Sequence, residues 1–360
     1  MLGSLFSKKG TERFVSVDVG TSAIKLMELD VSGSKPKLVS IASSATPGGS
    51  ITNNQITKAD QIAGAIRSLL DANDIAAEKA VMCLPGPTAF TKKVVLGMTR
   101  AKDLAENIYF EASNYIPHKV EQVHLDYQVL RVVNSASIEV LLVAVKNEII
   151  GSYIDAISQT GLQPAIGDID YFALQNMFEL NYPEELSKTN AIVNVGARYT
   201  SVNIIQDGQS LFTGDVSVGG RLYTDALCET LGLEPRAAER AKMGQIPEGV
   251  DANLVTETLD RTTEHVATEL HRQIGFFWNA AATDRSIDTI YLSGGGALSP
   301  GLVDELATKT GLPCVLLDPF RNVDTSAGFD ADFLSEVSSQ MAVSVGLAIR
   351  RFADKKQIID

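Results

Sequence analysis

The stretch FVSVDVGTSAIKLMEL, residues 14–29, places polar residues where an apolar strand would be expected to continue. Valines at alternate positions lead up to Gly20 and a second apolar run follows Ser22, so the pattern predicts a β-hairpin with Gly20, Thr21 and Ser22 at its tip. Backbone N–H groups at such a tip can close on a phosphate, and Asp18 just before it can hold a water-ligated Mg²⁺. An ordinary turn has the same residues, so this stretch alone leaves both interpretations open.

A second stretch repeats this design far along the chain. AIVNVGARYTSVNII, residues 191–205, has an apolar strand, the polar Asn194, then Gly196, and an apolar strand again. Aligning Gly20 with Gly196 also aligns Asp18 with Asn194. Two hairpins of one design suggest two duplicated lobes that hold the phosphates of one nucleotide between them.

Two motifs in the second half of the chain place glycines or charges at a helix start. FTGDVSVGGRLYTDAL predicts a strand followed by Gly219 and Gly220 at the beginning of a helix, where the helix dipole favours phosphate. EPRAAERAKMG predicts a helix with Glu239 and Lys242 on one face. That pair is also typical of a plain surface ion pair, so its role stays open.

The last motif is TIYLSGGGALSPGL, a buried-strand pattern that runs into three glycines. Gly294, Gly295 and Gly296 would let a flat ring lie against bare backbone. Ser299 and Pro300 then signal the start of a helix, which a merely flexible turn does not explain.

The bulk composition is that of an ordered, acidic protein with more than one lobe. The chain has 360 residues, of which 45% are apolar, and a net charge of -13. It contains no block of five or more basic residues, which argues against nucleic acid as the main ligand. No run of about 18 apolar residues occurs, so the sequence predicts no membrane-spanning helix.

In this order, the five motifs resemble the nucleotide-binding set of the superfamily of actin, heat-shock chaperones and sugar kinases. The resemblance implies an α/β, actin-like two-lobed ATPase fold that binds ATP or ADP with Mg²⁺. It places these residues around the nucleotide: Asp18, Gly20, Thr21, Ser22, Lys25, Asn194, Gly196, Ala197, Arg198, Gly219, Gly220, Glu239, Lys242, Gly294, Gly295 and Gly296.

The resemblance also suggests where a metal would be held. DIDYFALQNMF, residues 168–178, looks like the first connecting helix of the superfamily, which implies that Asp170, like Asp18, faces the metal through water. The superfamily usually has an aspartate in the second hairpin, whereas this chain has Asn194. Because an amide cannot supply the anionic charge that orients Mg²⁺ and its waters, we expect nucleotide binding with at most slow hydrolysis and no confident catalytic residue.

A separate subdomain is predicted between the two hairpins. Leu104, Ile108, Ala112 and Ile116 recur at spacings of four, which predicts an amphipathic helix ended by Pro117. FTKKVVLGM, LDYQVLRVV and IEVLLVAV supply three strands to pack against it. The sequence therefore predicts an inserted αβ subdomain.

The run from YIP to LDYQVL closely resembles the insert of the PilM family of type IV pilus assembly proteins, which is related to the division protein FtsA. The resemblance implies a scaffold at the cytoplasmic face of the bacterial inner membrane. It would bind the N-terminal cytoplasmic tail of PilN beside the insert, connect indirectly to PilO and PilP, and support pilus assembly and twitching motility. Candidate groove residues are Tyr115, Ile116 and Pro117. Pilus motor ATPases and a ring or dimer of the chain itself are further candidate partners.

The predicted domain limits follow from these motifs. Residues 1–82 and 164–190 form the first actin-like lobe, 83–163 the inserted partner-binding αβ subdomain, 191–335 the second lobe, and 336–360 a C-terminal helix that returns to the first lobe.

Two other functions stay open from the sequence. A small-metabolite kinase of the same superfamily would need a carboxylate base, for which Asp168 or Asp170 could be proposed. An FtsA-like filament-forming division protein would resemble this chain in fold, but that class has a C-terminal amphipathic anchor that RRFADKKQIID, residues 350–360, does not match.

Overall fold

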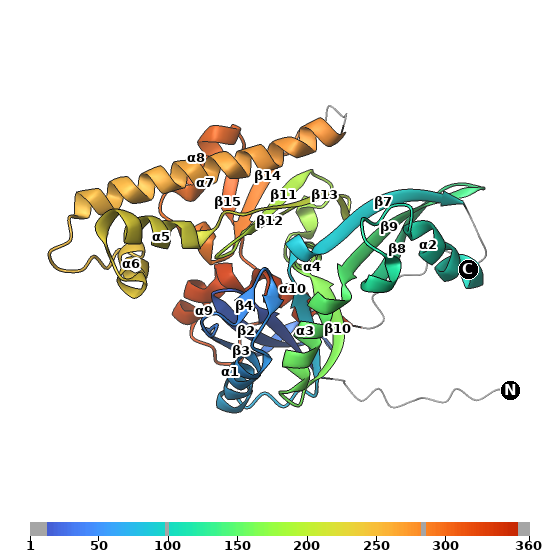
Figure 1. The fold of residues 1–360 in the computed structure, drawn as a ribbon, viewed down its shortest axis with the longest axis horizontal. Coiled ribbons are helices and arrows are strands. Elements are labelled where there is room, and N and C mark those ends of the chain that lie inside the picture. Colours follow the sequence, from blue (N-terminus) through green and yellow to red (C-terminus); the bar gives the residue numbers. More distant parts are fainter. Residues whose placement is uncertain (1–12, 98–100, 282–285, 352–360) are drawn as a thin grey trace.

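The computed structural model describes residues 13–97, 101–281 and 286–351 (Figure 1). Most of the C-terminal RRFADKKQIID segment lies outside these residues. Two five-stranded sheets dominate the chain, and a three-stranded sheet projects to one side of them (Figure 1). No helix in the described part of the chain is both long and apolar enough to cross a membrane.

The first sheet has the strand order β10-β6-β1-β2-β3. The pairs β1–β2 and β2–β3 are antiparallel, whereas β1–β6 and β6–β10 are parallel. All six residues of β1 are buried, including the polar Ser16 and Asp18, as expected for a central strand covered on both sides. The strands are β1 (Phe14–Val19), β2 (Ala23–Asp30), β3 (Lys37–Ala45), β6 (Lys79–Leu84) and β10 (Gln163–Ile169).

The second sheet repeats this topology strand for strand. Its order is β13-β12-β11-β14-β15, with β11–β12 and β12–β13 antiparallel and β11–β14 and β14–β15 parallel. The predicted duplication of the two hairpin lobes is therefore a duplication of the whole sheet. The strands are β11 (Asn190–Val195), β12 (Thr200–Gln206), β13 (Gln209–Val216), β14 (Thr289–Ser293) and β15 (Cys314–Leu316).

Helices cover both faces of the two sheets. Helices α1 (Ala59–Ala72) and α3 (Asn147–Ser158) pack on one face of the first sheet. Helices α4 (Asp170–Asn181) and α10 (Ala342–Ala348) fill the space between the two sheets, together with α9 (Ala331–Val337). A Cβ on Gly346 would collide with the carbonyl of Ala173, so α10 and α4 approach closely enough to require glycine.

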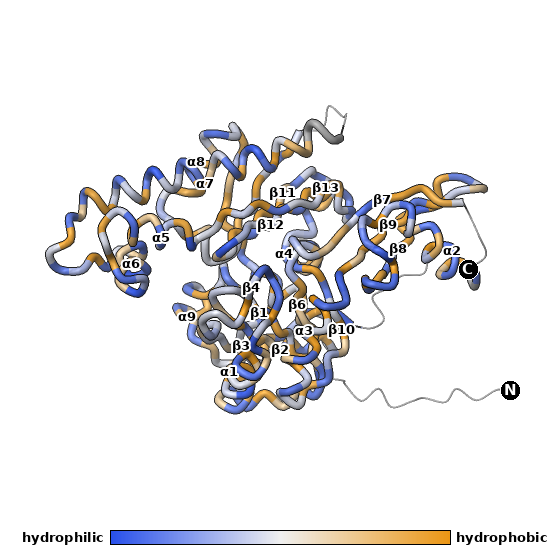
Figure 2. Tube along the Cα trace, in the orientation of Figure 1, coloured by the Kyte–Doolittle hydropathy of each residue, from blue (hydrophilic) through white to orange (hydrophobic). Residues whose placement is uncertain are grey.

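The far face of the second sheet is covered by its own helices, which are α5 (Gly220–Leu231), α6 (Pro235–Lys242), α7 (Ala252–Ala281) and α8 (Leu302–Thr310). Helix α7 alternates between hydrophilic and hydrophobic colouring along its length (Figure 2). Its apolar residues, among them Val266, Leu270 and Ile274, are buried on one side, as the spacing predicts.

The three-stranded sheet has the order β7-β9-β8, with α2 (Ala101–Ala112) packed on one face. Helix α2 ends earlier than predicted: Ile116 lies beyond it, although its N–H still donates to the carbonyl of Ala112. Helix α3 follows this sheet in the chain but packs in the core of the first sheet. The predicted domain limits, which put α3 in the inserted subdomain, stay predictions. The strands are β7 (Ala89–Gly97), β8 (Val123–Asn134) and β9 (Ser137–Lys146).

Candidate functional site

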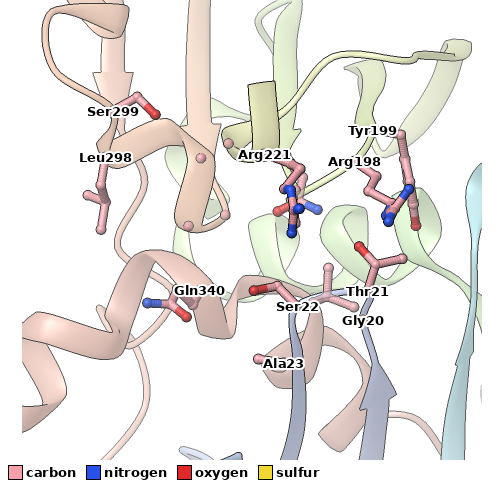
Figure 3. Close-up of a pocket in the computed structure, with 18 of the residues that line it drawn as sticks. Gly20, Thr21, Ser22, Ala23, Arg198, Tyr199, Arg221, Leu298, Ser299 and Gln340 are labelled. Carbon is pink, nitrogen blue, oxygen red and sulfur yellow. The ribbon is translucent and has the colours of Figure 1, made fainter. Parts of the chain in front are cut away.

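The tips of the two hairpins face each other across a cavity of about 540 Å³ between the lobes. This volume lies within the range of roughly 300–1,000 Å³ that is usual for small-molecule sites. Figure 3 shows Thr21 and Ser22 of the first hairpin opposite Arg198 and Arg221. All the residues predicted to surround the nucleotide line this cavity, except Gly219, and the predicted metal-facing Asp170 lines it too. The lining residues that were predicted are Asp18, Gly20, Thr21, Ser22, Lys25, Asn194, Gly196, Ala197, Arg198, Gly220, Glu239, Lys242, Gly294, Gly295 and Gly296.

The first hairpin is closed by its own backbone. The N–H of Gly20 donates to the carbonyl of Ala23 at 3.0 Å. Thr46, just after β3, holds the tip from outside: its hydroxyl donates to the carbonyl of Gly20 at 2.6 Å and its N–H to that of Ser22 at 3.0 Å. These bonds fix the turn and leave the side chains of Thr21 and Ser22 on the cavity wall.

The second hairpin has the same backbone arrangement. The N–H of Gly196 donates to the carbonyl of Tyr199 at 3.0 Å. The carbonyls of Gly196 and Ala197 accept from the N–H groups of Gly220 and Arg221, at 2.9 and 2.8 Å. The start of α5 therefore donates hydrogen bonds to the tip carbonyls of the second hairpin, as Thr46 does to those of the first.

The structure differs from the prediction at Gly219. This residue does not line the cavity; a Cβ on it would lie 2.5 Å from the carbonyl oxygen of Gly196 and 2.7 Å from that of Ala197. The glycine pair therefore lets α5 approach the hairpin backbone. The first N–H groups of α5 donate to protein carbonyls, so the helix start supports this part of the cavity wall from behind.

The three glycines after β14 make the wall beside the second hairpin. Gly294 has a φ of 86°, and a Cβ on it would collide with the carbonyl of Val195. Its N–H donates to the carbonyl of Ser339 at 2.6 Å, which ties this loop to the chain segment before α10. Gly295 lies beside Gln340, which lines the cavity from the segment before α10 (Figure 3).

Helix α6 supplies a charged pair at another part of the wall. Nζ of Lys242 lies 2.6 Å from Oε1 of Glu239, and the Thr224 hydroxyl donates to Oε2 at 2.5 Å. Burial raises the pKa of the Glu239 carboxyl, but the hydrogen bonds from Lys242 and Thr224 outweigh it and lower that pKa below its ordinary value. Glu239 is therefore an ionised carboxylate that is held by Lys242 and Thr224.

Asp170, the first residue of α4, is 2% exposed and ties the lobes together. Its Oδ2 accepts from the hydroxyls of Ser201 at 2.7 Å and Tyr199 at 2.9 Å, and its Oδ1 accepts from the N–H of Tyr171 at 2.6 Å. Burial raises the pKa of Asp170 to about 6, against the opposing effect of these hydrogen bonds.

The side chains present fit a divalent metal poorly. Asp18 pairs with Lys25 at 2.8 Å, Asp170 accepts bonds from three protein donors, and Asn194 carries no charge. Within residues 13–97, 101–281 and 286–351, no group of three or more His, Cys, Asp or Glu side chains could hold a metal ion. The side chains that the structure describes therefore do not form a direct metal site, and the roles of Asp18 and Asp170 toward a metal through water stay predictions.

Sequence reasoning missed several residues of the cavity. Arg221 stands inside the motif that contains Gly219 and Gly220 and could have been found from it, because a cation at a helix start beside two glycines is a recognisable phosphate signal. Gln340 and Val343 come from a segment without any motif, so only the packed structure brings them here. The other missed residues are Ala23, Cys83, Tyr199, Met243, Leu298, Ser299 and Pro300.

The candidate partner residues lie in the three-stranded subdomain. Ile116 is only 6% exposed and belongs to the core that α2 forms with the sheet. Tyr115 packs against this core and lies under the ammonium of Lys92, while Pro117 is exposed. The placement of Ile116 gives it a packing role, and a partner-binding role for Tyr115 and Pro117 stays a prediction.

A second, larger cavity of about 1,070 Å³ lies beside the three-stranded sheet. Its walls are the sheet face opposite α2, including Leu141 and Val143, and the strand β10. Helix α3 contributes Ile150 and Ile154, and residues 207–210, the turn before β13 and the start of that strand, reach the cavity from the second lobe. Because β8 and β10 are the edge strands of their sheets, this groove is bordered by two strand edges.

Comparisons with known proteins agree with this geometry. A family model described as type IV pilus assembly protein PilM matches residues 16–352. A solved structure titled "PilM-PilN type IV pilus biogenesis complex" is similar to the chain at 25% identity, with a TM-score of 0.83 over 93% of this chain and 97% of that one.

More distant structures share the fold alone. Ethanolamine utilization protein EutJ from Carboxydothermus hydrogenoformans has a TM-score of 0.54 at 13% identity, over 93% of this chain and 88% of that one. MreB5 of Spiroplasma citri bound to ADP has a TM-score of 0.51 at 12% identity, over 94% and 96%. The predicted actin-like ATPase fold with two α/β lobes is confirmed.

Proposed function

Because the chain belongs to the PilM family of type IV pilus assembly proteins, we propose that it is a nucleotide-binding scaffold that holds the N-terminal tail of PilN. The scaffold would lie peripherally at the cytoplasmic face of the inner membrane and connect through PilN to PilO and PilP. The observation that carries the proposal is the groove beside the three-stranded sheet, in a chain that resembles a PilM-PilN complex over nearly its whole length.

The groove has the features that an extended peptide requires. The edges of β8 and β10 can offer main-chain hydrogen bonds to an added strand, which is the usual source of affinity in β-augmentation. Leu141, Val143 and Ile154 offer apolar contacts for alternate side chains of such a peptide. We therefore assign the PilN tail to this groove rather than to the buried Ile116.

The nucleotide half of the proposal rests on the cavity between the hairpins. Its glycine-closed tips and its cations Lys25, Arg198, Arg221 and Lys242 suit a nucleoside di- or triphosphate. The fold relative MreB5 is described as bound to ADP in one structure and to AMPPNP in another. We propose ATP or ADP as the ligand of this chain, with recognition rather than turnover as its role.

The two halves of the proposal meet at the second lobe. The turn of residues 207–210 lines the groove, and Gln175 of α4 donates to the carbonyl of Gly208 at 2.9 Å. A nucleotide that draws the lobes together would move this part of the wall, and so change the groove. We expect the affinity for the PilN tail to differ with and without ATP; equal affinities would remove the coupling but leave peptide binding intact.

The test of the main proposal is the binding of a labelled peptide that copies the PilN N-terminus, measured by fluorescence anisotropy. Ile154, which is 41% exposed in the groove, is changed to Asp, and Phe276, which is 47% exposed on α7 outside it, serves as the matched control. We expect Ile154→Asp to weaken binding at least tenfold and Phe276→Asp to leave it unchanged. Equal affinities in the two variants would contradict the assignment of the groove.

A further inference from the structure

The cavity between the hairpins has four side-chain cations, and the acids beside it are already engaged. Lys25, Arg198, Arg221 and Lys242 all line it. Two of them are paired inside the site, Lys25 with Asp18 and Lys242 with Glu239. The other two, the arginines, come from the second lobe and face the tip of the first hairpin (Figure 3).

The two arginines differ in what holds them. Nε of Arg221 lies 2.7 Å from Oδ1 of Asp225, one turn further along α5, and both side chains are about half exposed. Arg198 stands at the tip of the second hairpin and forms no salt bridge with any residue that the structure describes. Its guanidinium therefore has its donors available for a phosphate, to which arginine binds in a bidentate manner.

The acids, by contrast, have little left to offer a metal. One oxygen of Asp18 accepts from Lys25, so the charge of this carboxylate is balanced within the first hairpin. Both oxygens of Asp170 accept hydrogen bonds from the second hairpin or from the backbone of α4. Mg²⁺ at phosphate sites is usually held by one or two carboxylates together with the phosphates. Here the charge of Asp18 is already balanced by Lys25, which leaves only its second oxygen, and both oxygens of Asp170 are engaged.

The second hairpin adds no negative charge of its own. At the position of Asp18 it has Asn194, whose Oδ1 accepts from the hydroxyl of Ser293 at 3.2 Å. A neutral amide is compatible with nearby arginines and phosphates but gives a hydrated cation no electrostatic advantage. The site thus has two arginines opposite the tip of the first hairpin and no added acid in the second hairpin.

We propose that this cavity binds the phosphates of a nucleotide through Arg198, Arg221 and the backbone of the hairpins, without requiring a divalent cation. The inference rests on the proposed nucleotide site and specifies its ligand as the free nucleotide anion. Nucleotide binding therefore persists when Mg²⁺ is removed.

The test is calorimetric titration of the full chain with ATP and ADP, once with excess Mg²⁺ and once with EDTA. We expect dissociation constants within about threefold of each other in the two buffers. Binding with Mg²⁺ that weakens more than tenfold in EDTA would overturn the inference and leave the proposed nucleotide site standing. Absence of binding in both buffers would overturn the nucleotide site itself, and the inference with it.

Two variants sharpen the test. Arg198→Ala is expected to lose at least tenfold in affinity in EDTA, whereas Arg236→Ala, an exposed arginine of α6 outside the cavity, keeps the affinity of the parent chain. Asn194→Asp restores an acid to the second hairpin, so we expect it to bind at least tenfold more tightly with Mg²⁺ than with EDTA. Equal binding of Asn194→Asp in both buffers, or no effect of Arg198→Ala, would contradict the role assigned to these side chains.

Discussion

The two hairpins have one backbone geometry and two different sets of charges. In each hairpin a glycine N–H donates to the carbonyl three residues further on, at a distance of 3.0 Å. The carbonyls at each tip accept hydrogen bonds from the chain segment that follows the third strand of the same sheet. The first hairpin pairs an acid with a cation, Asp18 with Lys25, whereas the second has the neutral Asn194 and the unpaired Arg198 among described residues.

This difference separates what the fold requires from what the ligand requires. The glycine turns and their carbonyl partners recur because the topology of the two sheets recurs, and a Cβ on Gly20 or Gly196 would crowd a carbonyl of its own hairpin. The side chains on the cavity wall are not under this restriction. The first hairpin thus carries a balanced charge and the second a net positive charge, and the proposed metal-free recognition of phosphate rests on this difference.

The largest effect is expected from breaking the backbone contact of the second hairpin. Gly219→Ala places a Cβ about 2.5 Å from the carbonyl oxygen of Gly196, so the start of α5 must move away. We expect the free energy of unfolding to fall by about 3 kcal/mol, and nucleotide binding to be lost. Chemical denaturation and calorimetric titration measure the two quantities.

The matched control for this change is Gly275→Ala in α7 of the same lobe. A Cβ there meets no atom within 4 Å, and alanine is the better helix former by about 1 kcal/mol, so the variant is expected to be slightly more stable and to bind nucleotide normally. A Gly219→Ala variant as stable as this control would show that the two backbones are not in firm contact.

The next effect concerns Asp170, which joins the second hairpin to α4. Its pKa is raised from 3.8 to about 6, so between these values the folded chain holds a proton that the unfolded chain has lost. This contribution to stability is complete below pH 4 and is lost as the pH rises to about 6, by on the order of 2 kcal/mol. Asp170→Asn removes the titration, so the difference in unfolding free energy between the parent and this variant should change with pH over that window. A difference that stays constant from pH 4 to 7 would contradict the raised pKa.

A smaller effect is expected from the charge pair of the first hairpin. Lys25→Met leaves the buried Asp18 carboxylate without its cation, which should cost about 1.5 kcal/mol of unfolding free energy. Replacing both residues, with Asp18→Asn added to Lys25→Met, should recover most of this loss. Chemical denaturation of the two single variants and the double variant measures the coupling, and strictly additive losses would mean that the pair is not an interacting unit.

The sequence was sufficient for features that depend on local pattern. Hairpins around Gly20 and Gly196, a helix from Pro235 and a strand before Gly294 are all predicted from alternation, glycine and capping residues, and all are confirmed by the element bounds. The resemblance to the PilM family is confirmed by the family match over residues 16–352.

The parts that sequence could not give depend on packing between distant segments. The hydrogen bonds from Tyr199 and Ser201 to Asp170 join residues about thirty positions apart in the chain. They form only because α4 packs against the second hairpin, which no local sequence pattern encodes. The sequence predicts a ligand contact for Gly219 because two glycines at a helix start have the same pattern whether a phosphate or a protein carbonyl lies in front of them. Ile116 follows the helical spacing but packs in the core after the helix has ended.

The smallest effect tests the outer support of the two hairpins. Thr46→Val removes the hydroxyl that donates to the carbonyl of Gly20, while its N–H can still donate to Ser22, so we expect a loss of about 1 kcal/mol and a twofold to threefold weaker nucleotide affinity. Thr57→Val removes a similar hydroxyl bond, to the carbonyl of Ser50, away from the cavity, and should leave nucleotide affinity unchanged.

In the second hairpin the carbonyl of Gly196 accepts from the backbone of Gly220, which no ordinary side-chain substitution removes. Removing a side-chain hydroxyl outside the cavity should therefore loosen the first hairpin tip but not the second, which is disturbed only by a change that displaces the backbone of α5, such as Gly219→Ala. Equal nucleotide affinities for Thr46→Val and Thr57→Val would show that the hydroxyl of Thr46 adds nothing to the tip, and that strand pairing alone holds the first hairpin in its binding geometry.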